Sequence, residues 1–293
     1  MYLLDYHFSS FVVLRRMGRE NDTLMNYTKI TSASNPKIKQ ALDIKNKRSK
    51  YKSAAFIIEG PHLIEMAAAS GHGIKEVFFT SAFSSKKEGQ KILMQALKIT
   101  NELFEISEQL FIKLTGTETP QGIIAIASYN PITPDDIAFK SIPLIVIVEG
   151  VQEPGNLGAI IRTSDAAGAD AVIILRGTCD AFSQKAIRAT AGSLFNIPII
   201  HSETAKLLSW LKTNKIQLAA TALDSEKSVF DADLTFPTAF VLGNEAHGIS
   251  AQMRKNSDSL LKIPIFGKAE SLNVSASAAI CLYEAVRQRS IKV

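Results

Sequence analysis

The sequence predicts an α/β protein with two domains, the second built on a mostly parallel sheet. At 293 residues the chain is longer than one compact domain usually is. Short apolar runs alternate with helical patterns, and Leu144–Val148 is a run of aliphatic residues typical of a strand buried on both faces. Hydrophobic residues make up 46% of the chain and charged residues 21%, which favours packed cores over disorder.

The first 28 residues precede the predicted domains. The apolar run at residues 8–14 does not have the charge order of a secretion signal, because an acidic residue precedes it and two arginines follow it. We interpret residues 1–28 as a disordered or mis-assigned extension, which leaves the start open between Met1, Met17 and Met25. No run of 18 apolar residues occurs, so no membrane span is expected.

Residues 29–128 are predicted to form a smaller N-terminal α/β domain. Asn35 followed by Pro36 is a helix-start signal, and the helical pattern continues to about Lys50. The elements predicted next are a strand at 54–58, a helix from 61 to about 70, a strand at 76–80, a helix around 90–99 and a strand at 123–127. Three prolines mark the following segment, and we take residues 129–141 as a linker.

The first helix of this domain is strongly basic. Its cations greatly outnumber its one acid, Asp43, and the net charge of the whole chain is +5. Both features suit a polyanionic partner, so we interpret the helix as a phosphate-contacting surface. An ordinary solvated helix face explains the same pattern, and the sequence leaves this alternative open. The residues expected to contact phosphate are Lys37, Lys39, Lys45, Lys47, Arg48 and Lys50.

Residues 142–293 are predicted to form the second domain. After the strand at 144–148, further apolar runs are separated by helical stretches, and this alternation favours an open α/β sheet with right-handed crossovers. The expected strands lie at 171–175, 218–221 and 239–242, and the expected helices at 156–167 and 205–212. Ligands of such sheets bind at the carboxyl ends of the strands.

The common cofactor signatures are absent from the sequence. It contains no G-x-G-x-x-G, G-x-x-x-x-G-K-[ST], G-x-S-x-G, H-E-x-x-H or C-x-x-C pattern, which argues against dinucleotide enzymes, P-loop enzymes, serine hydrolases and zinc sites. Cys179 and Cys281 lie in apolar sequence without metal-ligand spacing. We therefore expect two reduced packing cysteines, no metal and a cytoplasmic protein.

The first of three polar segments at strand ends runs from residue 149 to residue 163. Asn156 and Arg162 are six positions apart, so on a helix they lie roughly two turns apart on a related face. We take both as candidate site residues. The alternative is that Asn156 caps the helix and Arg162 makes a surface ion pair.

The second and third segments lie at 240–250 and 261–275. In the second, two glycines flank Asn244 and Glu245, so the backbone can approach a flat ligand closely; an ordinary tight turn is the alternative. The third places Ser271 and Asn273 at the entrance of a helix that continues to Arg289. A single helix cap is the alternative there, although Ser, Asn and Ser within five positions exceed what one cap requires.

Together the three segments resemble the SpoU or TrmH-like branch of the SPOUT RNA methyltransferases. The resemblance covers about residues 142–289 and rests on N-L-G-A-I-I-R-T, L-G-N-E-A-H-G-I and I-P-I-F-G-K-A-E-S-L-N-V-S. It implies a trefoil-knotted α/β fold, a homodimer through the C-terminal domain, and methyl transfer from S-adenosylmethionine to a ribose 2′-hydroxyl. Residues 119–123 are similar to the N-terminal substrate-binding domain of many members. Ala246-His247 stands where the family often has a small or acidic residue, and this position tolerates variation.

The resemblance also implies roles for individual residues. Arg162 would act on the ribose 2′-hydroxyl as it loses its proton. Because an arginine keeps its own proton at neutral pH, we expect Arg162 to position the hydroxyl and to stabilise the negative charge that develops on its oxygen. The other residues expected to be catalytic are Asn156, Glu245, Ser271 and Asn273. The residues expected to bind the cofactor are Thr221, Ala222, Leu242, Gly243, Asn244, Gly248, Ile263, Leu272 and Asn273. The basic residues of the first helix would bind RNA, and no metal is needed.

The sequence thus predicts an RNA ribose 2′-O-methyltransferase. We favour ribosomal RNA because the basic N-terminal domain resembles that of members that modify ribosomal RNA. Transfer RNA stays open as the substrate. The rival classes are an inactive RNA-binding protein of the same fold and an unrelated α/β nucleotide-binding enzyme.

Overall fold

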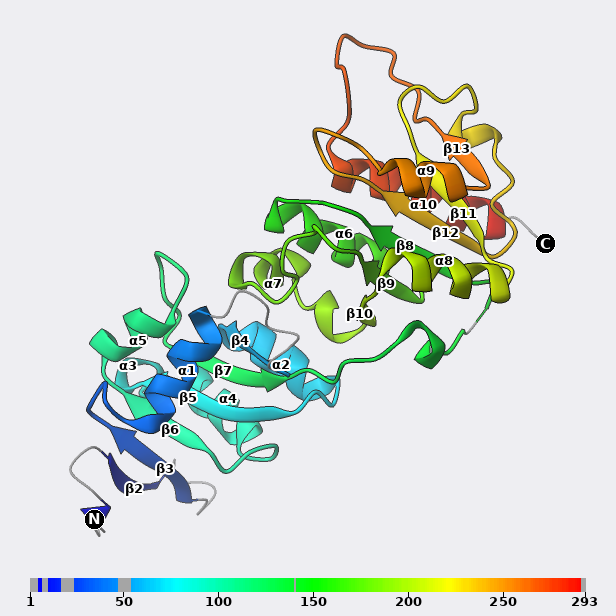
Figure 1. Cartoon of the computed structure of the whole chain (residues 1–293). Helices are drawn as coiled ribbons and strands as arrows, with labels where there is room; N and C mark the ends of the chain where they lie inside the picture. The colour runs from blue at the N-terminus through cyan, green and yellow to red at the C-terminus, as the bar shows by residue number, and fades with distance from the viewer. Residues whose placement is uncertain (1–4, 7–9, 17–23, 47–53, 140, 291–293) are drawn as a thin grey trace. The chain divides into compact units, whose positions relative to one another are not determined.

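The computed structural model describes residues 5–6, 10–16, 24–46, 54–139 and 141–290. The chain forms two compact units, residues 1–130 with 182–184, and residues 131–181 with 185–293 (Figure 1). The division after residue 130 falls within the segment expected to be the linker. None of the described helices combines the length and hydropathy that a membrane span requires.

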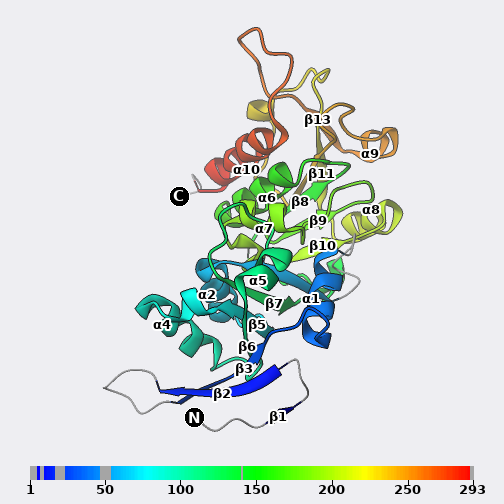
Figure 2. The same cartoon turned by 90° about the vertical axis from the view of Figure 1, so that its left-hand side faces the viewer.

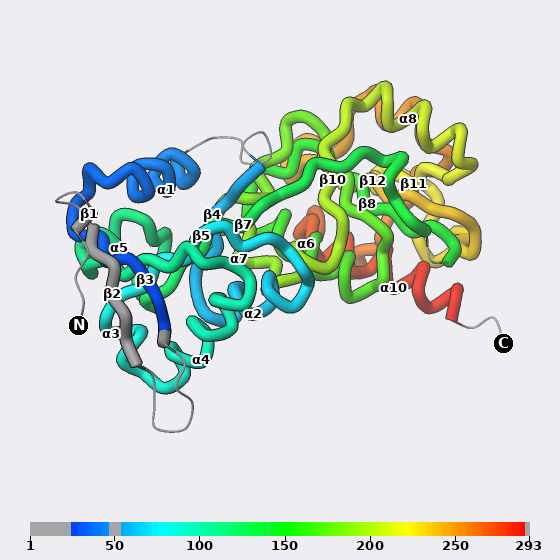
Figure 3. The backbone as a smooth tube through the Cα atoms, turned by 90° about the horizontal axis from the view of Figure 1, so that it is seen from below, coloured from blue at the N-terminus to red at the C-terminus, as the bar shows by residue number. Residues whose placement is uncertain are grey.

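The first unit is a mixed sheet with helices on both faces. Its described strands are β1 (Asp5–Tyr6), β2 (Ser10–Arg16), β3 (Leu24–Ile30), β4 (Ala55–Glu59), β5 (Ile74–Thr80), β6 (Leu103–Ile106) and β7 (Ile123–Ser128). Its described helices are α1 (Pro36–Asn46), α2 (Pro61–Ala69), α3 (Ser81–Ser84), α4 (Lys87–Ala96) and α5 (Glu108–Leu114). The strand order is β1-β2-β3-β6-β5-β7-β4. Figure 3 shows α1 and α5 on one side of this sheet and α2 and α4 on the other.

Strands β2 and β3 lie mostly within residues 1–28, the segment that the sequence analysis takes as a disordered or mis-assigned extension. They pair antiparallel along their whole length, and β3 also pairs with β6. Met25 and Tyr27 are buried while Asn26 between them is exposed, an alternation too short to stand out in the sequence. The ring of Tyr27 packs edge-on against Phe79 at 5.3 Å, so β3 is part of the core of this unit.

The sequence analysis also does not predict α3, β6 and α5 of the first unit. In β6 the carboxylate of Glu105 interrupts the apolar run that would indicate a strand. Glu105 is nevertheless buried, and it pairs with Lys29 at 3.1 Å. Helix α5 begins after Ser107, whose side chain accepts a hydrogen bond from the backbone N–H of Leu110. Helix α1 ends at Asn46, so the expected continuation to Lys50 lies outside the described residues.

The second unit contains the expected parallel sheet. Its strands are β8 (Leu144–Val148), β9 (Ala171–Ile174), β10 (Ile199–His201), β11 (Gln217–Thr221), β12 (Thr238–Leu242) and β13 (Ser259–Leu261). Its α-helices are α6 (Pro154–Ala166), α7 (Gln184–Thr190), α8 (Thr204–Thr213), α9 (Ala251–Asn256) and α10 (Val274–Ser290). The strand order is β10-β9-β8-β12-β11-β13, and every neighbouring pair is parallel. The aliphatic runs therefore form β8 and β9 as predicted, whereas β10, β13, α7 and α9 are not predicted.

Two layers of helices enclose this sheet. Helix α8 lies on one face, and α6 and α10 lie side by side on the other (Figure 3). On the α8 side, Leu207 and Leu211 pack with Ile145, Ile173 and other buried strand residues. On the other side, the expected stripe of α10 is buried: Ala278, Cys281, Leu282 and Ala285. Because α10 follows the last strand, this packing brings the C-terminal helix back beside the first helix of the unit.

Arg289 fixes the end of α10 to the start of the sheet. Its guanidinium donates hydrogen bonds to the carbonyl oxygens of Ile142 at 2.9 Å, Pro143 at 3.2 Å, Leu234 at 2.8 Å and Phe236 at 2.7 Å. These carbonyls belong to the segments that enter β8 and β12. One side chain thus joins the last helix to the two central strands.

Both cysteines are free thiols. Cys281 is buried in α10 as expected, and burial raises the pKa of its thiol to about 12. Cys179 differs from the expected packing residue, because it is only partly buried in the loop after β9. Its backbone N–H donates to the carbonyl of Val151, and burial raises the pKa of its thiol to about 11. Both thiols therefore stay protonated at neutral pH.

Candidate functional site

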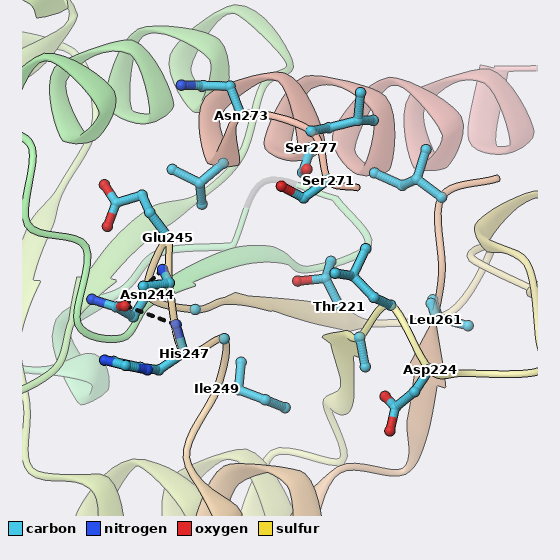
Figure 4. Close-up of a pocket in the computed structure, with 18 of the residues that line it drawn as sticks. Thr221, Asp224, Asn244, Glu245, His247, Ile249, Leu261, Ser271, Asn273 and Ser277 are labelled. Atoms are coloured by element: carbon cyan, nitrogen blue, oxygen red, sulfur yellow. Dashed lines mark hydrogen bonds between the residues drawn. The ribbon is translucent and has the colours of Figure 1, made fainter. Parts of the chain in front are cut away.

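A pocket of about 470 Å³ opens at the carboxyl ends of β11 and β12. Three stretches and Arg254 line it; the stretches are residues 221–224 after β11, residues 243–249 after β12, and parts of the segment from Leu261 to Ser277. Figure 4 shows Thr221, Ser271 and Ser277 around the same cavity, with Ile249 and Leu261 on its apolar side. The pocket lies where ligands of parallel sheets bind, and a volume of this size suits a small-molecule cofactor.

Most residues expected to bind the cofactor line this pocket. They are Thr221, Ala222, Gly243, Asn244, Gly248, Ile263, Leu272 and Asn273. Leu242 is the exception among the expected residues. Its side chain is buried in the sheet, and its carbonyl accepts a hydrogen bond from the backbone N–H of Glu149 at 2.9 Å. As the last residue of β12, Leu242 completes the strand ladder and does not face the cavity.

The turn after β12 requires glycine for a steric reason. Asn244 and Gly248 exchange two backbone hydrogen bonds of 2.8 and 2.9 Å, which fold the loop back on itself. A Cβ at Gly243 would lie 2.2 Å from the carbonyl carbon of Gly248 and 2.4 Å from the backbone nitrogen of Ile249. Gly248 itself has a φ of 67°, in the region that favours glycine. The glycines are therefore required by the tight turn itself, which is the alternative considered in the sequence analysis, and the backbone of this turn forms one wall of the pocket.

Glu245 joins the loop after β12 to the loop after β8. Its carboxylate accepts hydrogen bonds from the backbone N–H of Gln152 at 3.1 Å, the backbone N–H of Glu153 at 3.4 Å and Nδ2 of Asn156 at 3.0 Å. Desolvation opposes ionisation, but these hydrogen bonds outweigh it and hold the pKa of Glu245 below its ordinary value. The ionised carboxylate thus organises the start of α6.

Asn273 continues this network to the third segment. Its Nδ2 donates to Oδ1 of Asn156 at 3.0 Å, and its Oδ1 accepts from the backbone N–H of Ser275 at 2.9 Å and from Oγ of Ser275 at 2.6 Å. Asn273 is therefore both the cap of α10 and a link to α6. The capping alternative accounts for Ser275, whereas Ser271 lines the pocket. Figure 4 shows the carboxylate of Glu245 and the amide of Asn273 on the α6 side of the cavity.

A second connection between the same loops involves Glu149 and Ser250, which the sequence analysis does not select, together with Asn244. Ser250 donates to Glu149 through its backbone N–H at 2.8 Å and through Oγ at 2.7 Å, while its Oγ also accepts from the backbone N–H of Met253 at the start of α9. Asn244 donates from Nδ2 to the carbonyl of Gly150 at 2.7 Å. The loops after β8 and β12 are thus held together at both ends.

An ion pair at the pocket also escapes the sequence analysis. Arg254 of α9 donates two hydrogen bonds to the carboxylate of Asp224, at 2.9 and 2.8 Å, and both residues line the pocket. The hydrogen bond from Arg254 lowers the pKa of Asp224. The two residues are 30 positions apart, so only the fold reveals the pair.

Arg162 lies on α6 away from the pocket. Its side chain is exposed, and in the part of the chain that the structure describes it has no hydrogen-bond or ion-pair partner. The structure brings Asn156, Glu245 and Asn273 together and leaves Arg162 outside this network. The surface ion pair considered for Arg162 does not occur among the described residues.

The basic residues of α1 differ in what they contact. The amine of Lys37 pairs with Glu76 at 2.7 Å and with Glu102 at 2.8 Å, which raises the lysine pKa although desolvation opposes the shift. Lys45 donates to the carbonyls of residues 113 and 115, both at 2.7 Å. These two lysines stabilise the unit internally, which argues against their expected phosphate contacts. Lys39 is exposed, and the expected residues Lys47, Arg48 and Lys50 lie outside the described residues.

Comparison with known proteins identifies the family. The model of the SpoU rRNA Methylase family matches residues 143–283, and that of the MRM3-like substrate binding domain matches residues 35–125. One relative is the 23S rRNA (guanosine(2553)-2′-O)-methyltransferase RlmP of Bacillus subtilis (strain 168), which is 34% identical over 254 residues, 87% of this chain and 97% of the relative.

Solved structures agree with this assignment. The SpoU methyltransferase AviRb from Streptomyces viridochromogenes, in complex with the cofactor AdoMet, has a TM-score of 0.81 and 29% identity, covering 88% of this chain and 99% of that one. The AdoMet-bound rRNA methyltransferase from Sinorhizobium meliloti has a TM-score of 0.79 and 30% identity, covering 88% of this chain and 97% of that one. The expected resemblance is confirmed, and the chain belongs to the SpoU rRNA methylase family.

Proposed function

We propose that this protein transfers a methyl group from S-adenosylmethionine to a ribose 2′-hydroxyl of ribosomal RNA. The observation that carries the proposal is the pocket formed by the three polar segments, in a chain that relatives with this activity match over nearly their whole length. Relatives that are 23S rRNA methyltransferases favour ribosomal RNA as the substrate.

The pocket fits S-adenosylmethionine in size and chemistry. Apolar side chains such as Leu223, Ile249 and Leu261 supply a surface for a purine ring. The hydroxyls of Thr221, Ser271 and Ser277 supply polar contacts for the ribose and amino-acid parts. Gly243 lets the loop after β12 fold tightly on itself, so that its backbone forms one wall of the pocket. When bound there, the cofactor supplies the methyl group.

The residues around the pocket then divide into those that bind and those that position. Asn156, Glu245 and Asn273 fix the loops relative to one another through charge-assisted and amide hydrogen bonds. The attacking ribose oxygen gains negative charge as its proton leaves. An exposed guanidinium such as that of Arg162 would stabilise this charge and hold an adjacent phosphate.

We also propose that the second unit forms a homodimer whose active site is shared. The exposed, unpartnered Arg162 supports this, because a group that acts on the ribose must meet the cofactor pocket, and the pocket of its own subunit does not include it. The family resemblance further implies a trefoil knot. The return of α10 beside α6 after β13 is consistent with a chain that threads back through the site.

The N-terminal unit would deliver the RNA. Its match to a substrate-binding domain supports this role. Because Lys37 and Lys45 are engaged within the unit, Lys39 is the exposed α1 lysine best suited to phosphate. We infer that the basic segment after α1, with Lys47, Arg48 and Lys50, also contacts RNA.

The decisive experiment uses a variant of the glycine wall. Gly243→Ala places a Cβ against the backbone of Gly248 and Ile249, so we expect S-adenosylmethionine affinity to fall by at least tenfold in calorimetry. Methylation of 23S ribosomal RNA, located by mapping 2′-O-methyl sites, should fall with it. Gly267→Ala is the matched control, because nothing lies within 4 Å of a Cβ there. A Gly243→Ala protein that binds the cofactor normally would contradict the proposed pocket.

A further inference from the structure

Residues 185–196 run along one side of α6. Three contacts establish this: Lys185 pairs with Glu153 at 2.6 Å, a Cβ at Gly158 would lie 2.5 Å from the Cβ of Ala189, and Asn196 donates to Asp165 at 3.1 Å. The contacts follow the same order along both segments. Figures 1 and 2 show α6 and α7 as neighbours.

Arg162 faces this segment. It lies four positions after Gly158 and three before Asp165, and residues at these spacings share one face of a helix. Gly158 permits the close packing of α7 against α6. Asp165 accepts a hydrogen bond from Asn196, in the segment that follows α7. Arg162 therefore lies between the two contacts, beside the turn that ends α7.

Helix α7 presents cations on its outer face. Ala186, Ile187 and Thr190 are buried, whereas Lys185 and Arg188 are exposed one turn apart. Lys185 neutralises Glu153, the exposed carboxylate at the start of α6. With Arg162, these two residues form a basic edge, which we define as Arg162, Lys185 and Arg188.

The backbone beside this edge is strained. Helix α7 ends at two consecutive residues with positive φ, Ala191 at 49° and Gly192 at 97°. An alanine in this region costs about 1–2 kcal/mol. Such conformations persist where the surrounding structure fixes them, and they cluster at functional sites. The strained turn ends α7 abruptly and directs the chain along α6.

We propose that Lys185 and Arg188 bind phosphates of the substrate RNA next to the nucleotide that Arg162 contacts. This inference rests on the proposed function and adds an RNA-binding surface in the catalytic unit. A polyanion fits the edge by charge, because two exposed cations lie beside Arg162. Lys185 is paired with Glu153, but this ion pair lies on the surface, with the side chains 63% and 50% exposed, so a phosphate can compete with the carboxylate for the lysine. The edge would thus hold the backbone of the RNA while its ribose is methylated.

The test replaces both cations, Lys185→Gln with Arg188→Gln, in the full-length protein. With 23S ribosomal RNA transcribed in vitro, the slope of log affinity against log salt should shrink by about 1.4 to 1.8 in total, because each phosphate contact contributes about 0.7 to 0.9. The KM for RNA should rise on the order of tenfold, with kcat within about twofold. Calorimetry with S-adenosylmethionine and the melting temperature should not change.

The matched control removes two lysines from the other face of the same sheet. Lys206→Gln with Lys212→Gln on α8 changes the net charge equally, and both lysines are exposed. Equal slopes for the two double variants would overturn the inference. A lower melting temperature of the α7 variant with an unchanged slope would also overturn it, since that indicates a structural role. Binding slopes need no turnover, so failure of the wild-type protein to methylate RNA would count against the proposed function alone.

Discussion

At the scale of single residues, the carboxylate of Glu245 matters for what it accepts. Three N–H donors from the loop after β8 and the start of α6 converge on it, and its two oxygens must both stay unprotonated to satisfy them. A carboxylate bound in this way is a positioning group. Its role in the site requires that both of its oxygens accept hydrogen bonds.

We therefore expect Glu245→Gln to disturb the site although it keeps the size of the side chain. The amide NH₂ would oppose an N–H donor and leave one group unpaired, at a cost of about 1–3 kcal/mol. S-adenosylmethionine affinity should fall roughly 5- to 150-fold in calorimetry, as this energy implies, with turnover falling at least as far. Glu203→Gln is the control, because Glu203 is exposed and its side chain does not cap α8. Wild-type affinity in Glu245→Gln would show that the two loops hold their positions without the ionised group.

The polar part of the site could be predicted from single residues, and the rest could not. Glycine, asparagine and serine at strand ends are unusual enough to indicate a site, so Gly243, Asn156 and Ser271 stand out in the sequence. Leu223 and Ile265 also line the pocket. The sequence cannot distinguish a leucine or isoleucine in a cavity wall from one in a hydrophobic core. The side chain of Leu242 is buried and does not line the pocket, so a cofactor contact there would have to come from its backbone.

At the scale of elements, the long apolar runs are the ones that the sequence predicts. Strand β8 is aliphatic throughout and is buried throughout, whereas β13 has three residues and is a strand only because β11 offers its edge. Strand β3 shows the same dependence, since its partners β2 and β6 decide its place. Short strands depend on partners distant in sequence, so local pattern cannot reveal them.

The attachment of α10 predicts a stability effect. Arg289 donates to four carbonyls; alanine can make none of these bonds, and the three donors of a lysine ammonium cannot reach all four carbonyls. We expect Arg289→Ala to destabilise the second unit by on the order of 2–4 kcal/mol and Arg289→Lys by only somewhat less. Thermal unfolding followed by calorimetry measures this. Lys255→Ala, at an exposed position of α9, controls for loss of a cation and should melt as the wild type does. Equal melting temperatures of all three variants would contradict the proposed role of Arg289 in attaching α10 to the sheet.

At the scale of the whole molecule, a shared active site makes a prediction about mixed subunits. If Arg162 acts on the pocket of the partner, a dimer of one Arg162→Ala and one Gly243→Ala subunit contains one intact site and one with both defects. Mixing the two inactive proteins should then restore up to about a quarter of wild-type turnover, since random exchange gives half heterodimers with one working site each. Mass spectrometry verifies the exchange. No recovery after verified exchange would mean that each subunit acts alone.

The hydrogen bond between Asn273 and Asn156 spans 117 positions, and Glu245 reaches Gln152 across 93. Contacts between residues so far apart in sequence form late in folding, because closing the long loop between them costs chain entropy that other contacts must first offset. The pocket cannot be complete until α10 has docked, when most of the unit is already in place. Cofactor binding can therefore report on the order of folding. In a refolding experiment, it should appear with the last kinetic phase in which the second unit folds, after the secondary structure of that unit has formed.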